Sequence, residues 1–396
     1  MRPLVLPRPA ARRVRWPERP PHWPVLRSTV RGPAVTARIG RLLGIGFGIC
    51  FVTGLLSHYQ YHPWQWLPVP AAPYWGYRLT QGLHVITGLC CIPLLLVKLW
   101  SVFHRLLVWP PVRSLRHAAE RGSIAILVAA SAFQLVTGLL NILQYYPWPW
   151  GFVAVHYWMS WVLVGSLLLH VAVQLPAIRS GLAERVWRAP RQTPDESGPG
   201  PQGLSRRGVL LAGGAGIALV GAGTVGQVIP ALQPVALLAP RQPRRGPLGV
   251  PVNRTAQAAG VIRQAQSPQY RLSVHGPRLI VLTLSELESE PTVQTELPIA
   301  CVEGWSIQAH WRGIRLLDLV RRAGGDASSR VTVHSLERGS AYSSSVISGS
   351  QLPHAVLATH LNGSRIDIDH GYPIRLIAPD RAGVLQTKWL TRIDVA

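Results

Sequence analysis

Residues 122–178 read GSIAILVAASAFQLVTGLLNILQYYPWPWGFVAVHYWMSWVLVGSLLLHVAVQLPAI and contain no Asp, Glu, Lys or Arg. The segment YYPWPWG, residues 145–151, is rich in proline and aromatic residues and divides this run into two apolar halves. Each half reaches the ~20 residues that a helix needs to cross a bilayer. The run therefore predicts two transmembrane helices joined by a short turn.

Two further apolar runs lie N-terminal to this pair. Leu42–Ser57 predicts a helix that begins near Ile39, and Leu79–Val97 predicts one that continues to about Phe103. We therefore expect an all-α membrane domain, a four-helix bundle, over residues 39–178.

A fifth uncharged run, Gly208–Pro240, is rich in glycine and long enough for one more span. It predicts a fifth transmembrane helix over 208–230 that anchors the C-terminal region. Proline and arginine accumulate on both sides of this helix, which predicts a cytoplasmic linker at 179–207 and a second linker at 231–252.

Composition agrees with a membrane protein that carries a water-exposed domain. The 396 residues include 40 Lys+Arg against 17 Asp+Glu, a formal charge of +23, and 48% are hydrophobic. Five of the acidic residues precede residue 200 and twelve follow it. The N-terminal stretch 1–38 is rich in Arg and Pro without apolar periodicity, so we expect a disordered basic tail. A nucleic-acid binder is excluded, because the basic residues follow the loops of a membrane topology and not one groove-binding face.

The distribution of basic residues predicts the orientation in the membrane. Arg and Lys concentrate in the tail and in the 98–121 and 179–207 loops, whereas the 58–78 and 145–151 loops contain only Arg78. Basic loops stay in the cytoplasm, so we expect a multi-pass cell-membrane protein with a cytoplasmic N-terminus and an extracytoplasmic C-terminal domain. Arg241, Arg244 and Arg245 depart from the pattern, but long domains are translocated largely regardless of charge.

The four-helix region contains an internal repeat. VTGLLSHYQYHPWQW, Val52–Trp66, aligns without gaps with VTGLLNILQYYPWPW, Val136–Trp150, and ten of the fifteen positions are identical. Both copies end one helix and lead into the next. The four helices are therefore expected to be two hairpins in the same orientation.

Histidines within apolar helices are costly and indicate a function. His84 and His156 occupy equivalent positions in the second helix of each hairpin, so we expect them at one depth, as the two axial ligands of a b-type haem iron. His170 lies fourteen residues after His156, about 21 Å deeper on nearly the same face. That spacing resembles two-haem cytochrome b subunits of formate dehydrogenases, but the matching position after His84 is Lys98. His170 is therefore a candidate ligand of a second haem, or a residue that contacts a quinone or a haem propionate. For His84 and His156 the alternative is a pair of histidines that form hydrogen bonds at the membrane interface.

The fifth helix begins with a motif that resembles a twin-arginine export signal, SRRGVLL, residues 205–211. Such a signal is normally N-terminal. Its presence here is meaningful if the following domain must fold around a cofactor before it crosses the membrane.

From about residue 270 the composition becomes globular. The β-type runs are Arg271–Val274, Ile280–Leu284, Arg330–His334 and Ile374–Ile377, and a helix is expected near Leu316–Ala323. The pattern predicts an α+β domain with its own core over residues 253–396.

Four segments of this domain resemble the molybdopterin-binding domain of the sulfite oxidase family. They are PIACVEGWS (298–306), HWRGIRLLDLVRRAGG (310–325), LNGSRIDIDHGYPIRLIAP (361–379) and LQTKWLTRIDV (385–395). The layout is closest to the bacterial methionine sulfoxide reductase catalytic subunit, which works with a separate haem-containing membrane partner. The chain looks like such a pair fused.

The resemblance implies a molybdenum centre held by one pterin dithiolene and one protein thiolate, Cys301. A soft thiolate suits this metal. Tyr342 and Arg381 are expected to line the substrate pocket as catalytic residues. The residues implied to bind the cofactor are Asn253, Ser335, His370, Arg375 and Lys388.

The combined expectation is a membrane-bound oxidoreductase with Mo-molybdopterin and b-type haem. It would transfer an oxygen atom to or from a small or protein-bound S-oxide substrate on the outer face, and exchange electrons with the quinone pool through the haem. A sulfite-type dehydrogenase that passes electrons to the membrane stays open as an alternative, and so does a non-catalytic electron-transfer or sensor protein.

Overall fold

The computed structural model describes residues 33–64, 66–106, 112–184, 206–239, 241, 242, 244–340 and 342–396. The part of the tail before residue 33 and most of the 179–207 linker lie outside these residues. The chain divides into two compact units. The membrane unit comprises residues 1–48, 88–139 and 146–218, and the C-terminal unit comprises residues 49–87, 140–145 and 219–396.

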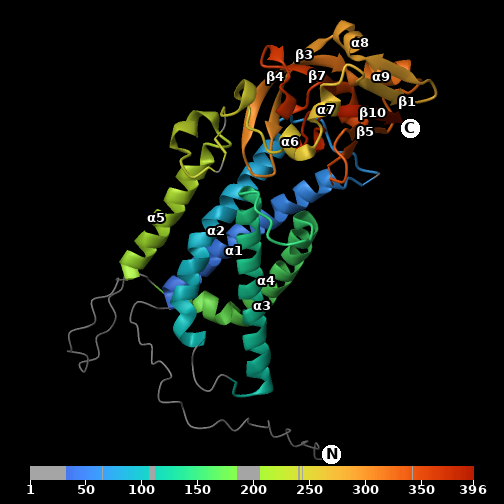
Figure 1. Ribbon diagram of the computed structural model, residues 1–396. Coiled ribbons are helices and arrows are strands. Elements are labelled where there is room, and N and C mark those ends of the chain that lie inside the picture. Colours follow the sequence, from blue (N-terminus) through green and yellow to red (C-terminus); the bar gives the residue numbers. More distant parts are fainter. Residues whose placement is uncertain are drawn as a thin grey trace, which may run out of the picture. The chain divides into compact units, whose positions relative to one another are not determined.

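Among the described residues, four helices are long and apolar enough to cross a membrane, as the sequence predicts. They are α1 (Pro33–Tyr61), α2 (Gly76–Leu106), α3 (Leu115–Ile142) and α4 (Phe152–Ala183) (Figure 1). Within the membrane unit their apolar side chains form one cluster, which includes Leu43, Phe47, Cys91, Leu95, Ala130 and Leu163.

The first helix begins earlier than predicted, because residues 33–38 are helical and not part of a disordered tail. Pro33 is tolerated at a helix start, where its missing N–H has no partner to lose. Arg38 explains the extension. Its guanidinium donates to the carbonyl oxygens of Gly181, Leu182 and Glu184 at 2.9–3.3 Å, where the last carbonyls of α4 lack intrahelical partners.

The fifth helix is shorter than predicted. α5 spans Arg206–Val225, and its apolar part, Leu210–Val225, is shorter than each of the helices α1–α4. The chain turns back at Gly226, where an added Cβ would lie 2.1 Å from the Leu232 carbonyl oxygen. A short 3₁₀ helix, η1 (Pro230–Val235), comes next. The predicted helix over 208–230 therefore ends before its expected boundary.

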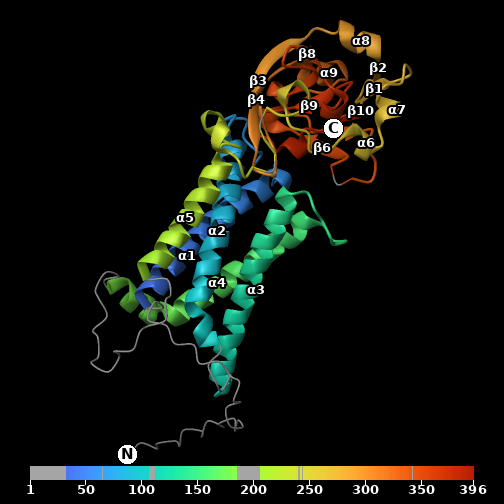
Figure 2. The same cartoon turned by 60° about the vertical axis from the view of Figure 1, so that its left-hand side comes forward.

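The C-terminal region is an α+β domain, as predicted, built on two sheets (Figure 2). The first sheet has the order β2-β1-β10-β5-β6, and the second has β3-β4-β7-β8, with β9 paired to β7. The strands are β1 (Arg271–His275), β2 (Ile280–Thr283), β3 (Val293–Ala300), β4 (Ser306–Arg315), β5 (Val331–Ser335), β6 (Ser344–Ile347), β7 (Val356–Leu361), β8 (Ser364–Arg365), β9 (Arg375–Ile377) and β10 (Leu390–Val395).

Short helices precede the first strand and connect the later ones, and all four predicted β-type runs coincide with strands. The helices are α6 (Ala256–Ala259), α7 (Ile262–Ala265), α8 (Leu284–Ser289), α9 (Leu316–Arg322), η2 (Pro247–Gly249), η3 (Gly349–His354), η4 (Ile368–His370) and η5 (Gly383–Leu385). The main core joins strands of both sheets to α9, which presents Leu316, Leu319 and Val320 without exposure.

The predicted second linker, 231–252, is partly integrated into this domain. Val250 is fully buried in a cluster with Cys301 and Trp305. Asn362 Nδ2 also donates to the Leu248 carbonyl at 2.8 Å. Burial of Val250 and this hydrogen bond both stabilise the stretch against the domain, so the folded domain begins before residue 253.

Candidate functional site

Cys301 directly follows β3, in a tight turn that leads into β4. The turn is closed by hydrogen bonds from Cys301 N to the Trp305 carbonyl at 2.9 Å and from Gly304 N to the Cys301 carbonyl at 3.0 Å. Gly304 has φ +92°, a conformation that glycine adopts without steric cost. The thiol-bearing residue is 2% exposed.

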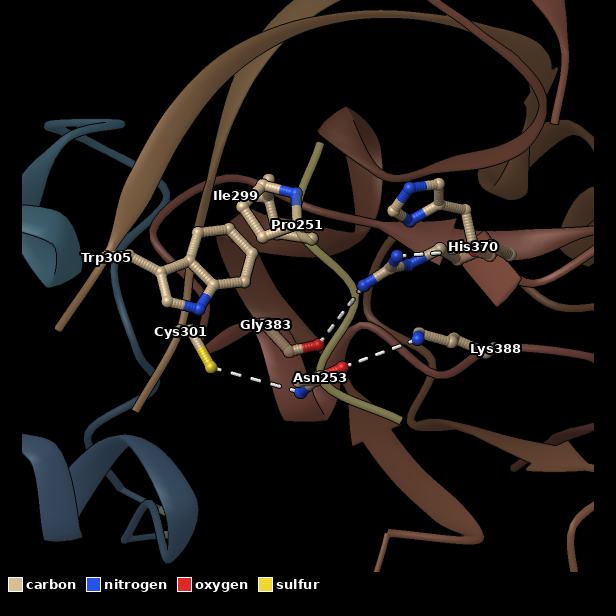
Figure 3. A pocket seen from close by; sticks show the side chains of 9 residues that line it. Pro251, Asn253, Ile299, Cys301, Trp305, His370, Gly383 and Lys388 are labelled. Carbon is tan, nitrogen blue, oxygen red and sulfur yellow. Dashed lines mark hydrogen bonds between the residues drawn. The ribbon is translucent and has the colours of Figure 1, made fainter. Parts of the chain in front are cut away.

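Cys301 lines a pocket together with residues from distant parts of the chain (Figure 3). Its lining residues are Pro251, Asn253, Ile299, Cys301, Trp305, His370, Arg375, Gly383 and Lys388. Five of the eight residues that the sequence assigns to the molybdenum site are among them.

Asn253 connects the thiol to a cation. Its Nδ2 lies 3.9 Å from Cys301 Sγ, and its Oδ1 accepts from Lys388 Nζ at 3.4 Å, as Figure 3 shows. Lys388 Nζ also donates to the carbonyl oxygens of Asp369 at 2.7 Å and Arg254 at 2.9 Å. Burial and the neighbouring charge of Arg375 lower the pKa of Lys388 to about 7, while Asp369 opposes that shift.

Arg375 is the second cation of the pocket and is 2% exposed. It donates to the carbonyl oxygens of Gln386, His370 and Gly383 at 3.1–3.4 Å. Burial lowers its pKa to about 9, so it stays charged at neutral pH. The ion pairs formed among the described residues include neither Arg375 nor Lys388.

His370 supports the pocket as a neutral side chain. Its Nε2 lies 3.0 Å from the Pro247 carbonyl oxygen and 3.1 Å from that of Val250, so this nitrogen carries the hydrogen and donates. Burial, together with the charges of Arg375 and Lys388, lowers its pKa to about 4. The bonds hold the segment before Pro251 against the domain.

These residues fit an anionic group that contains a soft metal. Arg375 is buried and Lys388 half-buried, and neither forms an ion pair with a described carboxylate, which favours an anion in the pocket. A planar guanidinium beside an ammonium suits a phosphate. Cys301 supplies one soft ligand. Burial and the nearby Glu303 carboxylate raise the pKa of the free thiol, so metal binding must displace its proton.

Three predicted site residues lie elsewhere and do not line this pocket. Ser335, at the end of β5, accepts at Oγ from Glu337 N at 3.0 Å. Arg381 is held by protein acceptors: the carbonyl oxygens of Leu385 and Val346 at 2.9 and 2.7 Å, and Gln351 Oε1 at 3.2 Å.

Tyr342 is the third, and it lies within electrostatic reach of Cys301. Burial and that thiol raise its pKa. Because none of the three lines the pocket, the catalytic roles of Tyr342 and Arg381 and the cofactor-binding role of Ser335 stay predictions.

A buried carboxylate beside Cys301 was not anticipated from the sequence. Glu303 is 2% exposed, pairs with Arg241 at 2.9 Å and accepts from Trp305 Nε1 at 3.1 Å. Gln144 also donates to Glu303, and its Oε1 accepts from Arg241 at 2.5 Å. The available signal was a charged residue inside the apolar segment PIACVEGWS. Arg241, which departs from the predicted charge asymmetry, is the partner of this buried acid.

The candidate haem ligands repeat the same local contacts in each hairpin. His84 Nδ1 lies 2.9 Å from the Cys50 carbonyl oxygen and 3.1 Å from Thr53 Oγ1. Its Nδ1 therefore carries the hydrogen. A Cβ on Gly54 would lie 3.3 Å from the His84 ring.

In the second hairpin, His156 Nδ1 lies 3.4 Å from Thr137 Oγ1, and a Cβ on Gly138 would lie 3.7 Å from the His156 ring. Thr137 and Gly138 are the repeat equivalents of Thr53 and Gly54. His170 is farther along α4, in electrostatic reach of Lys98 and Glu120.

Comparison with known proteins supports the site assignment at the level of the domain. Residues 259–396 match the family described as oxidoreductase molybdopterin binding domain. Human mitochondrial sulfite oxidase is 29% identical over 157 residues, which cover 32% of this chain and 29% of the human protein. Chicken sulfite oxidase is 30% identical over 159 residues, which cover 32% of this chain and 35% of the chicken protein.

A protein named as a putative protein-methionine-sulfoxide reductase subunit, YedZ1 of Azospira oryzae, is 26% identical over 139 residues. These cover 34% of this chain and 52% of that protein. The chain thus spans about a third of the sulfite oxidases and about half of the Azospira subunit. Residues 259–396 of this chain therefore match the oxidoreductase molybdopterin binding domain, and the chain is similar to the sulfite oxidases over part of their length.

Proposed function

We propose that the protein is a membrane-bound molybdopterin-dependent oxidoreductase that transfers oxygen atoms at a Cys301-ligated metal and exchanges electrons with the quinone pool through b-type haem. The observation that carries the proposal is the convergence of Cys301, Asn253, Arg375 and Lys388 on one pocket with excess positive charge. These residues come from separate segments, and the pocket lies in a domain of the matching family.

The side chains of this pocket have separate tasks in the proposed reaction. A molybdenum–pterin group bound there would supply two-electron oxygen-atom transfer. Cys301 would hold the metal, Arg375 and Lys388 would bind the anionic pterin, and Asn253 would orient the thiolate through its amide. Trp305, fixed by Glu303, forms an apolar wall that limits water at the thiolate.

We favour an S-oxide as the substrate, with methionine sulfoxide as its type. The Azospira relative carries that activity in its name, and its match covers a larger share of its length than the sulfite oxidase matches cover of theirs. Sulfite oxidation with electrons passed to the membrane is the second candidate, favoured by the similarity to human and chicken sulfite oxidases.

The haem proposal rests on the repeated surroundings of His84 and His156. A metal-ligating imidazole usually donates its other ring N–H to a carbonyl or similar acceptor, which orients the ring. His84 does so toward Cys50, and Thr53 and Thr137 contact the equivalent nitrogens. A haem between two such histidines would supply single-electron transfer between the quinone pool and the molybdenum site.

We also propose that α1–α4 cross a lipid bilayer with the basic loops in the cytoplasm and the molybdopterin domain outside. Four apolar helices of sufficient length support the membrane location. The orientation rests on the charge distribution of the sequence.

Metal analysis of the purified full chain, followed by turnover of a substrate panel, tests the function. We expect molybdenum and iron, and reduction of S-oxides with a quinol donor. Oxidation of sulfite with a quinone acceptor, without S-oxide reduction, would favour the second candidate. A protein that contains neither metal would be a sensor or structural protein, and the proposed activity would be wrong.

A further inference from the structure

The loop that carries Cys301 packs on α2 within the C-terminal unit, next to His84. At Gly304 an added Cβ would lie 2.8 Å from Val85 Cβ. Any side chain at this position would therefore separate loop and helix. Gly304 allows the backbone of residues 302–304 to lie directly on the helical turn that contains His84 and Val85.

A hydrogen bond joins the same loop to α2. Gln81 Nε2 donates to the Val302 carbonyl at 2.7 Å. Gln81 Oε1 in turn accepts from Ser57 Oγ on α1 at 3.4 Å. The Gln81 side chain is 7% exposed, so both ends of a buried amide are bonded and its orientation is set. Val302 is the residue next to Cys301, so this bond ends one peptide from the thiol.

His84 follows Gln81 by three residues, which is about 4.5 Å along a helix axis. The connection from the thiol to the imidazole therefore consists of covalent bonds and one short hydrogen bond. Electronic coupling decays more slowly through such bonds than across a gap between nonbonded atoms.

The internal repeat gives a comparison within the chain. The residue three positions before His156 is Val153, where the first hairpin has Gln81. Thr53 and Gly54 are matched by identical residues in the second copy, so the histidine environment itself is repeated. A buried glutamine costs free energy in an apolar helix unless it is bonded. The glutamine thus belongs to the contact with the Cys301 loop and not to the common histidine site.

We propose that Gln81 is an electron-transfer residue, which connects Cys301 to His84 through the Val302 carbonyl. This inference rests on the proposed function, because it needs a metal at each end. With both metals bound, the reductive direction would pass one electron from the haem iron held by His84 to the molybdenum held by Cys301, with no bond formed or broken. A quinol supplies the electrons, and two such steps match one oxygen-atom transfer.

The test compares Gln81→Met with Asp380→Ala in the full-length holoprotein. Methionine is close in size to glutamine but cannot donate to the Val302 carbonyl. Asp380 Oδ1 accepts from Tyr77 N at 2.5 Å, so its loss weakens another contact between the domain and α2 that does not start at the Cys301 loop. The readout is the rate at which pre-reduced haem is reoxidised after S-oxide is added, followed by its absorbance.

We expect a severalfold slower haem reoxidation in Gln81→Met, with unchanged haem spectrum, metal content and S-oxide reduction by an artificial one-electron donor. Asp380→Ala should retain the rate of the unmodified protein. If Gln81→Met does not fold, Ser57→Ala replaces it, since it frees Gln81 Oε1 and should slow the same step to a smaller degree. Equal rates in the Gln81 or Ser57 variant and the unmodified protein would overturn the inference.

A second measurement needs no cofactor. A photo-crosslinking residue at Val85 should label peptides that contain residues 302–305 in protein stripped of metals. Labelling elsewhere would contradict the contact on which the path depends. Absence of haem or molybdenum from the unmodified protein would instead refute the proposed function, so the two failures are distinguishable.

Discussion

Single residues in the pocket show how burial and charge select a ligand. Arg375 and Lys388 both donate to backbone carbonyls, which orient them, and neither forms an ion pair among the described residues. Only Lys388 titrates near neutral pH, because an ammonium loses its proton far more readily than a guanidinium. Pterin binding should therefore depend on the protonation of one side chain.

At Cys301 we expect the substitution Cys301→Ser to abolish turnover while leaving the haem absorbance intact. A hydroxyl group is a harder and weaker ligand than a thiolate for this metal. The measurement is S-oxide reduction alongside the visible spectrum. Cys90→Ser removes a thiol in the membrane unit and should keep full turnover. Full turnover in Cys301→Ser would contradict the assignment of the ligand.

At Lys388 the prediction concerns the stability of cofactor-free protein. Burial and Arg375 lower its pKa from the ordinary 10.5 to about 7, so above that pH the folded chain has lost a proton that the unfolded chain still holds. Stability should therefore rise with pH, by at most about 1.4 kcal/mol for each pH unit between roughly pH 7 and 8.5. The titratable groups that act on Lys388 are Arg375, Asp369, Cys301 and Glu337.

Thermal unfolding of the cofactor-free protein across this pH window measures the effect. Arg375 and Cys301 titrate above the window, and His370 is already neutral within it. Lys388→Met should unfold at a temperature that no longer rises in this way. A wild-type unfolding temperature that stays constant or falls would show that Lys388 is not perturbed as described.

At the scale of elements, the two hairpins share the same contacts around one histidine each. Each has a Thr-Gly pair on its first helix that contacts a histidine on its second. Glycine lets the histidine ring approach the helix, and threonine contacts its Nδ1. The two hairpins differ at α2, which contacts the Cys301 loop through Gln81 and at Gly304. The second hairpin has Val153 at the position of Gln81.

The hairpin prediction is that His84→Ala and His156→Ala each remove the same haem. A low-spin haem with two axial imidazoles requires both of them. Spectra and iron-to-protein ratios of the two variants measure this. Loss of different haems, or no change in either variant, would count against the pairing. His170→Ala distinguishes one haem from two, because it lowers the iron ratio only if His170 is also a ligand.

At the scale of the whole molecule, the compact units do not follow the division into membrane helices and C-terminal domain. Residues 49–87, the adjoining ends of α1 and α2, cluster with the molybdopterin domain. Gln144, just after α3, joins the same unit through Glu303 and Arg241. The C-terminal domain therefore forms one compact unit with the adjoining ends of α1 and α2, and a flexible linker is not its only connection to these helices.

The whole-molecule prediction concerns export. A domain folded around its cofactor cannot cross by a route for unfolded chains, and α5 begins at Arg206-Arg207. Changing both to Lys keeps the charge, so the topology of α1–α4 should be retained. We expect this double variant to keep haem but to leave the C-terminal domain protected from external protease. Normal exposure of an active domain would refute a twin-arginine route.

The sequence by itself predicted the four apolar helices, the strand runs and five of the nine residues that line the pocket. An uncharged apolar run of sufficient length is enough to predict a membrane span. The segment PIACVEGWS identifies Cys301 because it resembles the corresponding segment of the sulfite oxidase family. The repeat likewise indicated His84 and His156 as an equivalent pair, because each lies in the helix that follows one copy of the repeat.

Only the tertiary structure decided which residues meet. Nothing in the sequence pairs Glu303 with Arg241 and Gln144, or Gln81 with Val302, because these contacts join segments separated by 62 to 221 residues. The sequence likewise does not show that the Arg381 guanidinium donates to two backbone carbonyls and to Gln351. Nor does it show that Val250, in the predicted linker, is buried. Hydrogen-bond partners and burial depend on where distant segments pack, and that information is absent from any local pattern of residues.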